Sequence, residues 1–546
     1  MYNTGVSVDI NMSKSADDLI AESVFLDMTR VCACFMTMYI YTCIMLNGPS
    51  WSNMRPFLTS MGLASVVLGV PIAYGITCAF GYSYMPHFAT LPFLMVGLGI
   101  DDMFVIMQIF RNLENIKDQS LEERIGLTMK HAGVAITVTS LTDICAFGVG
   151  ASTVFPGLRA FCVACSVGIA AIYILQATWF VAWLVIDEKR RAKNANCYTL
   201  PCINCVSEKF EISDKVWPMF SNLLDHKLYH VLVTLLSAVF LSIGIWGCLT
   251  IKQEFRISKF FPSDSYLSEW MRKFDGHFDE FDKNFAIYTG SLETLDDFNK
   301  LDNLTQTLNT WIEKDGTLVS MDNWWIQFNQ HILEYTNITD WRTLFDDSSV
   351  KGFQYYLSDF LYSPNGGKYI SNLRFNETLF CSSPAPLITA SSIPISYLKN
   401  DGLELRRLKR NTLENFIESL NTTDKTFSHG AYYFAWDIEE QVGFELWRNL
   451  GASMLCIFII TLLLLNKFFA CILVNGSVII SVVNVVGFVR FWDISIDIMS
   501  LFTIVIIVGI CVDYPVHIVH AYLVSKGKFQ YLEVFQYHSK MVLSGL

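Results

Sequence analysis

The sequence predicts an all-α polytopic membrane bundle of nine spans, arranged as a parallel pseudo-repeat, with one inserted α+β domain. Three observations support this fold class. The chain is 52% hydrophobic and only 16% charged. It contains nine apolar stretches long enough to cross about 30 Å of hydrocarbon. One long acidic segment interrupts them. A soluble chain of 546 residues carries more charge and no such series of apolar stretches.

The apolar stretches fall into three groups, of which the first contains five closely spaced spans. Residues 1–30, which precede the first span, carry several acidic side chains and an amphipathic stretch from Ser15 to Thr29. They contain no apolar core of the signal-peptide type. The expected spans are 31–46, 57–80, 88–110, 132–151, 157–186, 229–250, 449–466, 468–490 and 495–523.

Basic residues give the orientation of the bundle. Lys and Arg gather in the connections 111–130 and 187–228, whereas the loops 81–87 and 152–156 contain neither. Because basic loops stay in the cytosol, the two rich connections are expected there. The long segment 252–446 is then expected outside the cell or in a lumen.

The segment 252–446 has the composition of a soluble module. It contains 29 Asp and Glu against 18 Lys and Arg, so it holds −11 of the total charge of −12. Residues 284–290 and 431–436 are predicted strands, and residues 292–314 a predicted amphipathic helix, which together indicate an α+β domain. Four glycosylation sequons agree with an outside location: Asn303, Asn337, Asn376 and Asn421.

The fifteen cysteines do not indicate a disulfide framework, because most lie in spans, where a thiol acts as a small apolar side chain. The outside module has only Cys381, which excludes a bridge within it. Three cysteines cluster in the expected cytosolic linker without an evident fourth ligand for zinc, so no metal site is predicted. Either they are palmitoylation sites or they are unmodified thiols: Cys197, Cys202 and Cys205.

Two Gly-x-x-x-Asp motifs lie at membrane depth, at Gly97–Asp101 and Gly509–Asp513. A charged side chain at the bilayer centre costs roughly 2.5–3.5 kcal/mol on insertion scales, so it usually faces a partner or a watery path. Each motif ends 20 residues after an outer turn, at Gly81 and Asp493 respectively. The matching register and direction indicate parallel repeats.

Helical spacing places further ionisable groups beside the two motifs, since residues four and seven apart share a face. Carboxylates and imidazoles at the midplane suit a proton or small-cation relay, although satisfied helix–helix hydrogen bonds are an alternative. The candidate relay residues are Asp101, Asp102, Asp513, His517 and His520. Close helix approach at the relay is expected at three glycines: Gly97, Gly99 and Gly509.

Both motifs resemble those of a known family. Residues 92–105 resemble the fourth-span motif of Patched and Patched-related proteins, which belong to the resistance-nodulation-division (RND) superfamily and carry a sterol-sensing domain. Residues 508–517 are similar to the tenth-span counterpart. The resemblance implies an RND-like fold, with Asp101, Asp102 and Asp513 at the cation-relay positions of the family. His517 matches a recurrent residue.

The resemblance also implies a domain division. Because the family has twelve spans and two ectodomains, the chain is expected to be a fragment of a twelve-span member. The expected parts are 1–30, the tail of a first ectodomain with a pre-span helix; 31–186, a five-span sterol-sensing-domain-like bundle; 187–228, a cytosolic linker; 229–250, the span opening the second half; 252–446, the glycosylated ectodomain; 449–523, three spans; and 524–546, a truncated cytosolic helix.

The function implied by these features is transport of a sterol or another lipid-like molecule, coupled to movement of a proton or monovalent cation. The alternative is a sterol-sensing receptor or regulator without net transport. No enzymatic activity is expected, because no nucleophile elbow, metal-ligand spacing or phosphate-binding loop is present. No cofactor and no nucleic-acid partner are expected either. The expected location is the plasma membrane or an endolysosomal membrane.

Overall fold

The computed structural model contains two compact units. One, the mixed unit, lies within residues 255–440, and the other, the helical unit, lies within residues 12–254 and 441–546. The structure describes residues 15–524 apart from these ranges: 47–54, 85, 114–119, 194–226, 252–264, 278–280, 316–317, 337–338, 346–349, 399–402, 423, 431–432 and 493.

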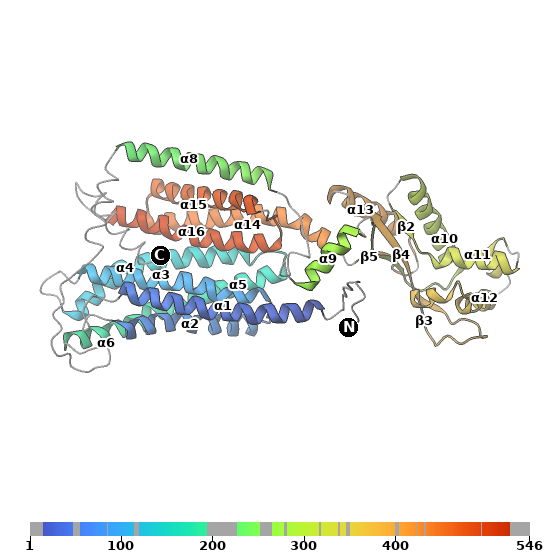
Figure 1. The fold of residues 1–546 in the computed structure, drawn as a ribbon, viewed down its shortest axis with the longest axis horizontal. Helices are drawn as coiled ribbons and strands as arrows, with labels where there is room; N and C mark the ends of the chain where they lie inside the picture. Colours follow the sequence, from blue (N-terminus) through green and yellow to red (C-terminus); the bar gives the residue numbers. More distant parts are fainter. Residues whose placement is uncertain are drawn as a thin grey trace, which may run out of the picture. The chain divides into compact units, whose positions relative to one another are not determined.

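Nine helices in the described part of the chain are long and apolar enough to span a membrane, which confirms the predicted bundle (Figure 1). The fifth crossing is continuous and contains a π-helical turn at Gln176–Phe180. The crossings are α1 (Ser15–Leu46), α2 (Pro56–Ala79), α3 (Leu91–Leu113), α4 (Leu121–Gly150), α5 with α6 (Pro156–Leu175 and Val181–Ala192), α8 (Lys227–Thr250), α14 (Tyr433–Leu465), α15 (Phe468–Val489) and α16 (Ile498–Val524).

Local sequence explains where several of these helices begin and end. The Ser120 side chain accepts a hydrogen bond from the Glu123 backbone N–H, and the Glu123 carboxylate accepts one from the Ser120 N–H, forming a capping box before α4. Pro56 and Pro156 occupy the first turns of α2 and α5, where a missing N–H costs little. Gly81, at φ 87°, turns the chain after α2.

Packing within the helical unit places α16 between the other groups of helices. Helices α2 to α5 pack on one another, α16 packs on both α4 and α15, and α8 packs on α15. The α8–α15 contact is unusually close. A Cβ on Gly247 would lie 2.2 Å from the Gly487 carbonyl oxygen, so only glycine fits. Because α16 contacts the first group directly, side chains on α3, α4 and α16 can meet.

A buried ion-pair network joins the ends of α2, α4 and α6, which the sequence places on the cytosolic side. The Arg55 guanidinium is 3% exposed and lies 2.7 Å from the Glu188 carboxylate and 3.6 Å from Asp187. Glu188 also pairs with Arg124 at 2.8 Å and with Arg191 at 2.8 Å. Several arginines share the two buried carboxylates, which offsets the cost of taking them out of water.

The mixed unit is a small antiparallel sheet with packed helices, as expected for an α+β domain. Its strand order is β2–β4–β1–β5, with β3 also paired to β4. The strands are β1 (Phe281–Thr289), β2 (Ser320–Met321), β3 (Leu373–Phe375), β4 (Ile388–Leu398) and β5 (Phe427–Gly430). The helices are α9 (Tyr266–His277), α10 (Leu295–Thr310), α11 (Trp324–Thr336), α12 (Val350–Tyr362) and α13 (Leu403–Ser419).

One predicted strand of this module is wrong. The prediction for 431–436 fails because β5 ends at Gly430 and α14 begins at Tyr433. The aromatic run favoured a strand, yet Tyr433 and Trp436 are buried with helical spacing while Phe434 is exposed. The predicted strand 284–290 corresponds to β1, and the predicted helix 292–314 corresponds to α10 followed by a π-helical turn at Trp311–Asp315.

Three of the four sequons have an exposed asparagine in the mixed unit: Asn303, Asn376 and Asn421. Asn337 lies outside the described residues, as do Cys197, Cys202 and Cys205 of the linker. Glycosylation and palmitoylation of these residues therefore remain predictions.

Candidate functional site

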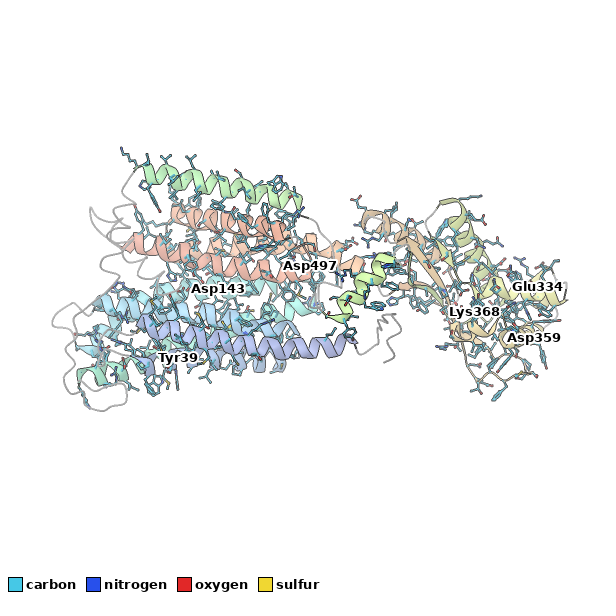
Figure 2. All side chains as sticks on the ribbon, viewed as in Figure 1. Tyr39, Asp143, Glu334, Asp359, Lys368 and Asp497 are labelled. Atoms are coloured by element: carbon cyan, nitrogen blue, oxygen red, sulfur yellow. The ribbon has the colours of Figure 1, made fainter. Side chains whose placement is uncertain are left out.

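Three helices bring four carboxylates and one imidazole together inside the helical unit. Helix α3 contributes Asp101 and Asp102, α4 contributes Asp143, and α16 contributes Asp513 and His517. All are buried except Asp101, which is half-buried. Figure 2 marks Asp143 on α4 within this unit.

A direct contact joins the two predicted motifs. The His517 Nε2 atom lies 3.6 Å from the Asp101 Oδ2 atom, an ion-pair distance that is slightly longer than a hydrogen bond. His517 lies one helical turn after Asp513, so both occupy the same face of α16. The side chain of His520 lies outside the described part of the chain, and its place on this face remains a prediction.

A small cavity lies at the centre of the cluster, with room for roughly one water molecule. Two carboxylate oxygens beside it, Oδ1 of Asp143 and Oδ1 of Asp513, are buried and accept no hydrogen bond within the described residues. The residues that line the cavity are Leu98, Gly99, Asp101, Asp102, Thr139, Ser140, Asp143, Ile169, Ile172 and Asp513.

The electrostatics of this cluster require positive charge. An ionised carboxylate that is buried without a hydrogen bond is costly, and close carboxylates repel one another. Protons on some carboxyls, a protonated His517 or a small cation in the cavity would each relieve that repulsion. The arrangement is therefore chemically suited to take up and release a proton or a small cation.

Sequence reasoning did not identify Asp143. It belongs to no Gly-x-x-x-Asp motif, which is the pattern that identified the other carboxylates. A simpler criterion would have found it, since Asp143 is the only charged residue within the predicted span 132–151. The cost of burying charge in a membrane applies to it as it does to Asp101.

Two of the three predicted packing glycines lie at close contacts. A Cβ on Gly99 would lie 2.7 Å from the Val66 side chain, and one on Gly509 would lie 3.1 Å from Oδ1 of Asp143. Apart from the local backbone of α3, no described atom lies within 4 Å of a Cβ built on Gly97, so the close helix approach predicted there is not found among the described residues. Gly97 lies on a different face of α3 from Gly99, because residues two apart on an α-helix point in nearly opposite directions.

A second overlooked residue, Gln176, holds the backbone of α3 next to the cluster. Its side-chain Nε2 donates to the Gly99 carbonyl at 3.0 Å and to the Ser65 hydroxyl at 2.9 Å. Gln176 is completely buried and begins the π-helical turn of the fifth crossing. Turns of this kind often occur at functional sites.

Comparison with known proteins agrees with the motifs. Residues 51–205 match the family described as the sterol-sensing domain of SREBP cleavage-activation. The chain is 21% identical to the NPC intracellular cholesterol transporter 1 of Sus scrofa, over 96% of this chain and 46% of the relative. It is 25% identical to Protein patched homolog 2 of Mus musculus, over 40% of this chain and 19% of the relative. The chain therefore contains a sterol-sensing-domain-like region and is similar to NPC1-type and Patched-type membrane proteins.

The fold of this chain is similar to that of a solved structure. The cryo-EM structure of the hedgehog release protein Disp from the water bear Hypsibius dujardini matches with a TM-score of 0.60 at 12% identity, over 97% of this chain and 65% of that one. The chain spans about half the length of the full-length curated relative from Sus scrofa. The matched sterol-sensing region overlaps the predicted bundle 31–186 and extends past it. These comparisons identify a multi-pass membrane protein.

Proposed function

We propose that this chain forms part of a membrane transporter that moves a sterol or another lipid-like molecule, coupled to movement of a proton or monovalent cation through the acidic cluster. The proposed relay consists of Asp101, Asp102, Asp513 and His517, with Asp143 added from the structure. The sterol-sensing match and the cholesterol transporter among the relatives support the substrate class.

The observation that carries the coupling is the contact between His517 on α16 and Asp101 on α3, beside two carboxylate oxygens that accept no hydrogen bond from any described residue. It joins the corresponding spans of the two repeats at one point. Because an added proton or cation would change the attraction between α3 and α16, its arrival would favour a different packing of the two halves. A coupled transporter needs such a change in packing, because it connects the arrival of the ion to the movement of the substrate.

The test is proton flux and sterol transfer by the chain reconstituted in vesicles. Asp101→Asn combined with Asp513→Asn is expected to reduce both activities to background, measured with a trapped pH-sensitive dye and with transfer of the fluorescent sterol dehydroergosterol. Tyr514→Phe is a matched control. Tyr514 adjoins Asp513 but is exposed, so its variant should keep the parental rates.

Parental flux and transfer in the Asp101→Asn, Asp513→Asn double variant, at equal protein incorporation, would refute the coupling. Loss of proton flux with unchanged sterol transfer would show that the two movements are independent.

The sensor is a second candidate function, and the sterol-sensing match to residues 51–205 favours it. A sensor binds sterol without moving it. Photo-crosslinking of a sterol to the chain that is unchanged in the double variant, together with an absence of sterol transfer by the parental chain, would support the sensor over the transporter.

A further inference from the structure

A second group of buried polar side chains lies on the middle turns of α14, from Glu445 to Ser453. The Glu445 carboxylate is fully buried, and one oxygen accepts hydrogen bonds from the Thr153 hydroxyl at 2.6 Å and from Arg448 at 2.6 Å. Its other oxygen, Oε1, has no hydrogen-bond partner among the described residues. Thr153 belongs to the turn between α4 and α5, which the charge pattern places on the outer side.

The polar face continues down α14 in steps of one helical turn. Asn449 and Ser453 follow Glu445 at spacings of four and eight, so the three share one face. Asn449 and Ser453 are 2% and 4% exposed. Asn449 accepts a hydrogen bond from Arg448 through its Oδ1 atom, but its Nδ2 atom has no partner within the described part of the chain.

A small cavity lies beside this face, between α14 and α16. Asn449 and Ser453 line it from α14, and Leu501, Val505 and Val508 line it from α16. An unpaired amide N–H next to a cavity of this size is a site for a bound water molecule, because leaving the group dry is costly.

Helix α16 connects this cavity to the acidic cluster. Val508 lines the cavity, and Asp513 of the cluster lies five residues further along, which corresponds to about 7.5 Å of helix rise. Gly509, between them, leaves room for the unpaired Oδ1 atom of Asp143. Between the two cavities, α16 carries the apolar side chains of Ile510, Cys511 and Val512. The two cavities are therefore separated by one short apolar step.

We propose that Glu445, Asn449 and Ser453 form the outer branch of the cation pathway, a line of polar, hydrated positions from which a proton or a small monovalent cation crosses the short apolar step to Asp143 and Asp513. The proposal rests on the proposed coupling. Glu445 is the outermost polar side chain of the branch, held by Thr153 of the outer turn, and Asn449 and Ser453 bind water on the way inward.

The first experiment measures access to this branch and needs no transport activity. Ser453→Cys in the full chain is exposed to Ag⁺, a thiol-reactive ion similar in size to Na⁺, in intact vesicles. Leu455→Cys is the matched control, since Leu455 lies at nearly the same depth of α14 but is 60% exposed on its other side, where lipid is expected. Bound Ag⁺ is scored as protection from alkylation after unfolding, above the background of the native cysteines.

We expect Ag⁺ to protect Ser453→Cys and to leave Leu455→Cys unprotected. Equal protection of the two thiols, or none in either, would overturn the branch.

The second experiment separates the branch from the coupling itself. Asn449→Leu keeps the side-chain size but removes the groups that bind water, and it is expected to lower proton flux about tenfold, which corresponds to about 1.4 kcal/mol. Asp513→Asn, assayed in parallel, tests the coupling. Protein incorporation and photo-crosslinking of sterol should be unchanged in both variants, which controls for folding.

Loss of flux in both variants supports the branch. Parental flux in Asn449→Leu with loss in Asp513→Asn overturns the branch and leaves the proposed function intact. Parental flux in Asp513→Asn contradicts the coupling, and Ag⁺ access alone then decides whether the hydrated branch exists.

Discussion

Replacing Gly247 by alanine tests how closely α8 and α15 pack. The new Cβ would lie 2.2 Å from the Gly487 carbonyl oxygen and 2.7 Å from its carbon, whereas ordinary contact begins near 3.4 Å. Both opposing atoms belong to the backbone, so no side chain can rotate away. The two helices must therefore separate by about 1 Å over this contact, and overpacking of this kind costs about 1–3 kcal/mol.

Gly476→Ala on α15 is the matched control. Apart from the local backbone of α15, no described atom lies within 4 Å of a Cβ at Gly476. Alanine there is expected to be neutral or to stabilise the helix by up to about 1 kcal/mol. The free energy of unfolding is measured for both variants in mild detergent by titration with dodecyl sulfate, followed by circular dichroism. If Gly247→Ala unfolds at the same dodecyl sulfate fraction as Gly476→Ala, the backbone contact between α8 and α15 does not exist.

Three further predictions follow from individual contacts. Arg55→Gln should lower the unfolding free energy by about 3 kcal/mol in the same titration, because it leaves buried carboxylates of α6 short of a partner. Asp143→Asn should lower proton flux as much as Asp513→Asn, and a parental rate would remove Asp143 from the pathway. Hydrogen bonds from Ser291 hold the pKa of Asp424 below its usual range. The ionised carboxylate therefore stabilises the fold at pH values above the pKa that Asp424 has in the unfolded chain. This stabilisation is lost as the pH falls through the lower pKa of the folded state. Hydrogen exchange near Ser291 should therefore be faster in Asp424→Asn at neutral pH, and the difference should disappear in acid.

The spans and the paired motifs could be predicted because both follow from one strong cost, that of placing charge or bare backbone in hydrocarbon. Asp101 and Asp513 were identified for this reason. Their partners were harder to predict, because helical spacing gives the face that His517 occupies but not the helix that it meets. The contact with Asp101 depends on how α3 packs against α16, which no local pattern encodes.

Other features were missed where local patterns competed or where helix packing decided the outcome. The aromatic run at 431–436 has the composition of a strand, but the helix of the following span extends back to Tyr433. Gly97 and Gly99 look alike in sequence, and only the packing of α2 and α5 against α3 distinguishes the crowded position from the open one. The role of Gln176 depends equally on packing, since its two partners lie on two other helices.

The side-chain amide of Gln176 also limits which parts of the protein can slide past one another. It connects the fifth crossing to α2 through Ser65 and to α3 through the Gly99 carbonyl, deep in the interior. Shearing these three helices would break two buried hydrogen bonds together, so they are expected to move as one rigid block that carries Asp101 with it. A rocking motion is then expected to leave this block intact and to change the shape of the cavity that Asp102 of the block and Asp513 of α16 both line.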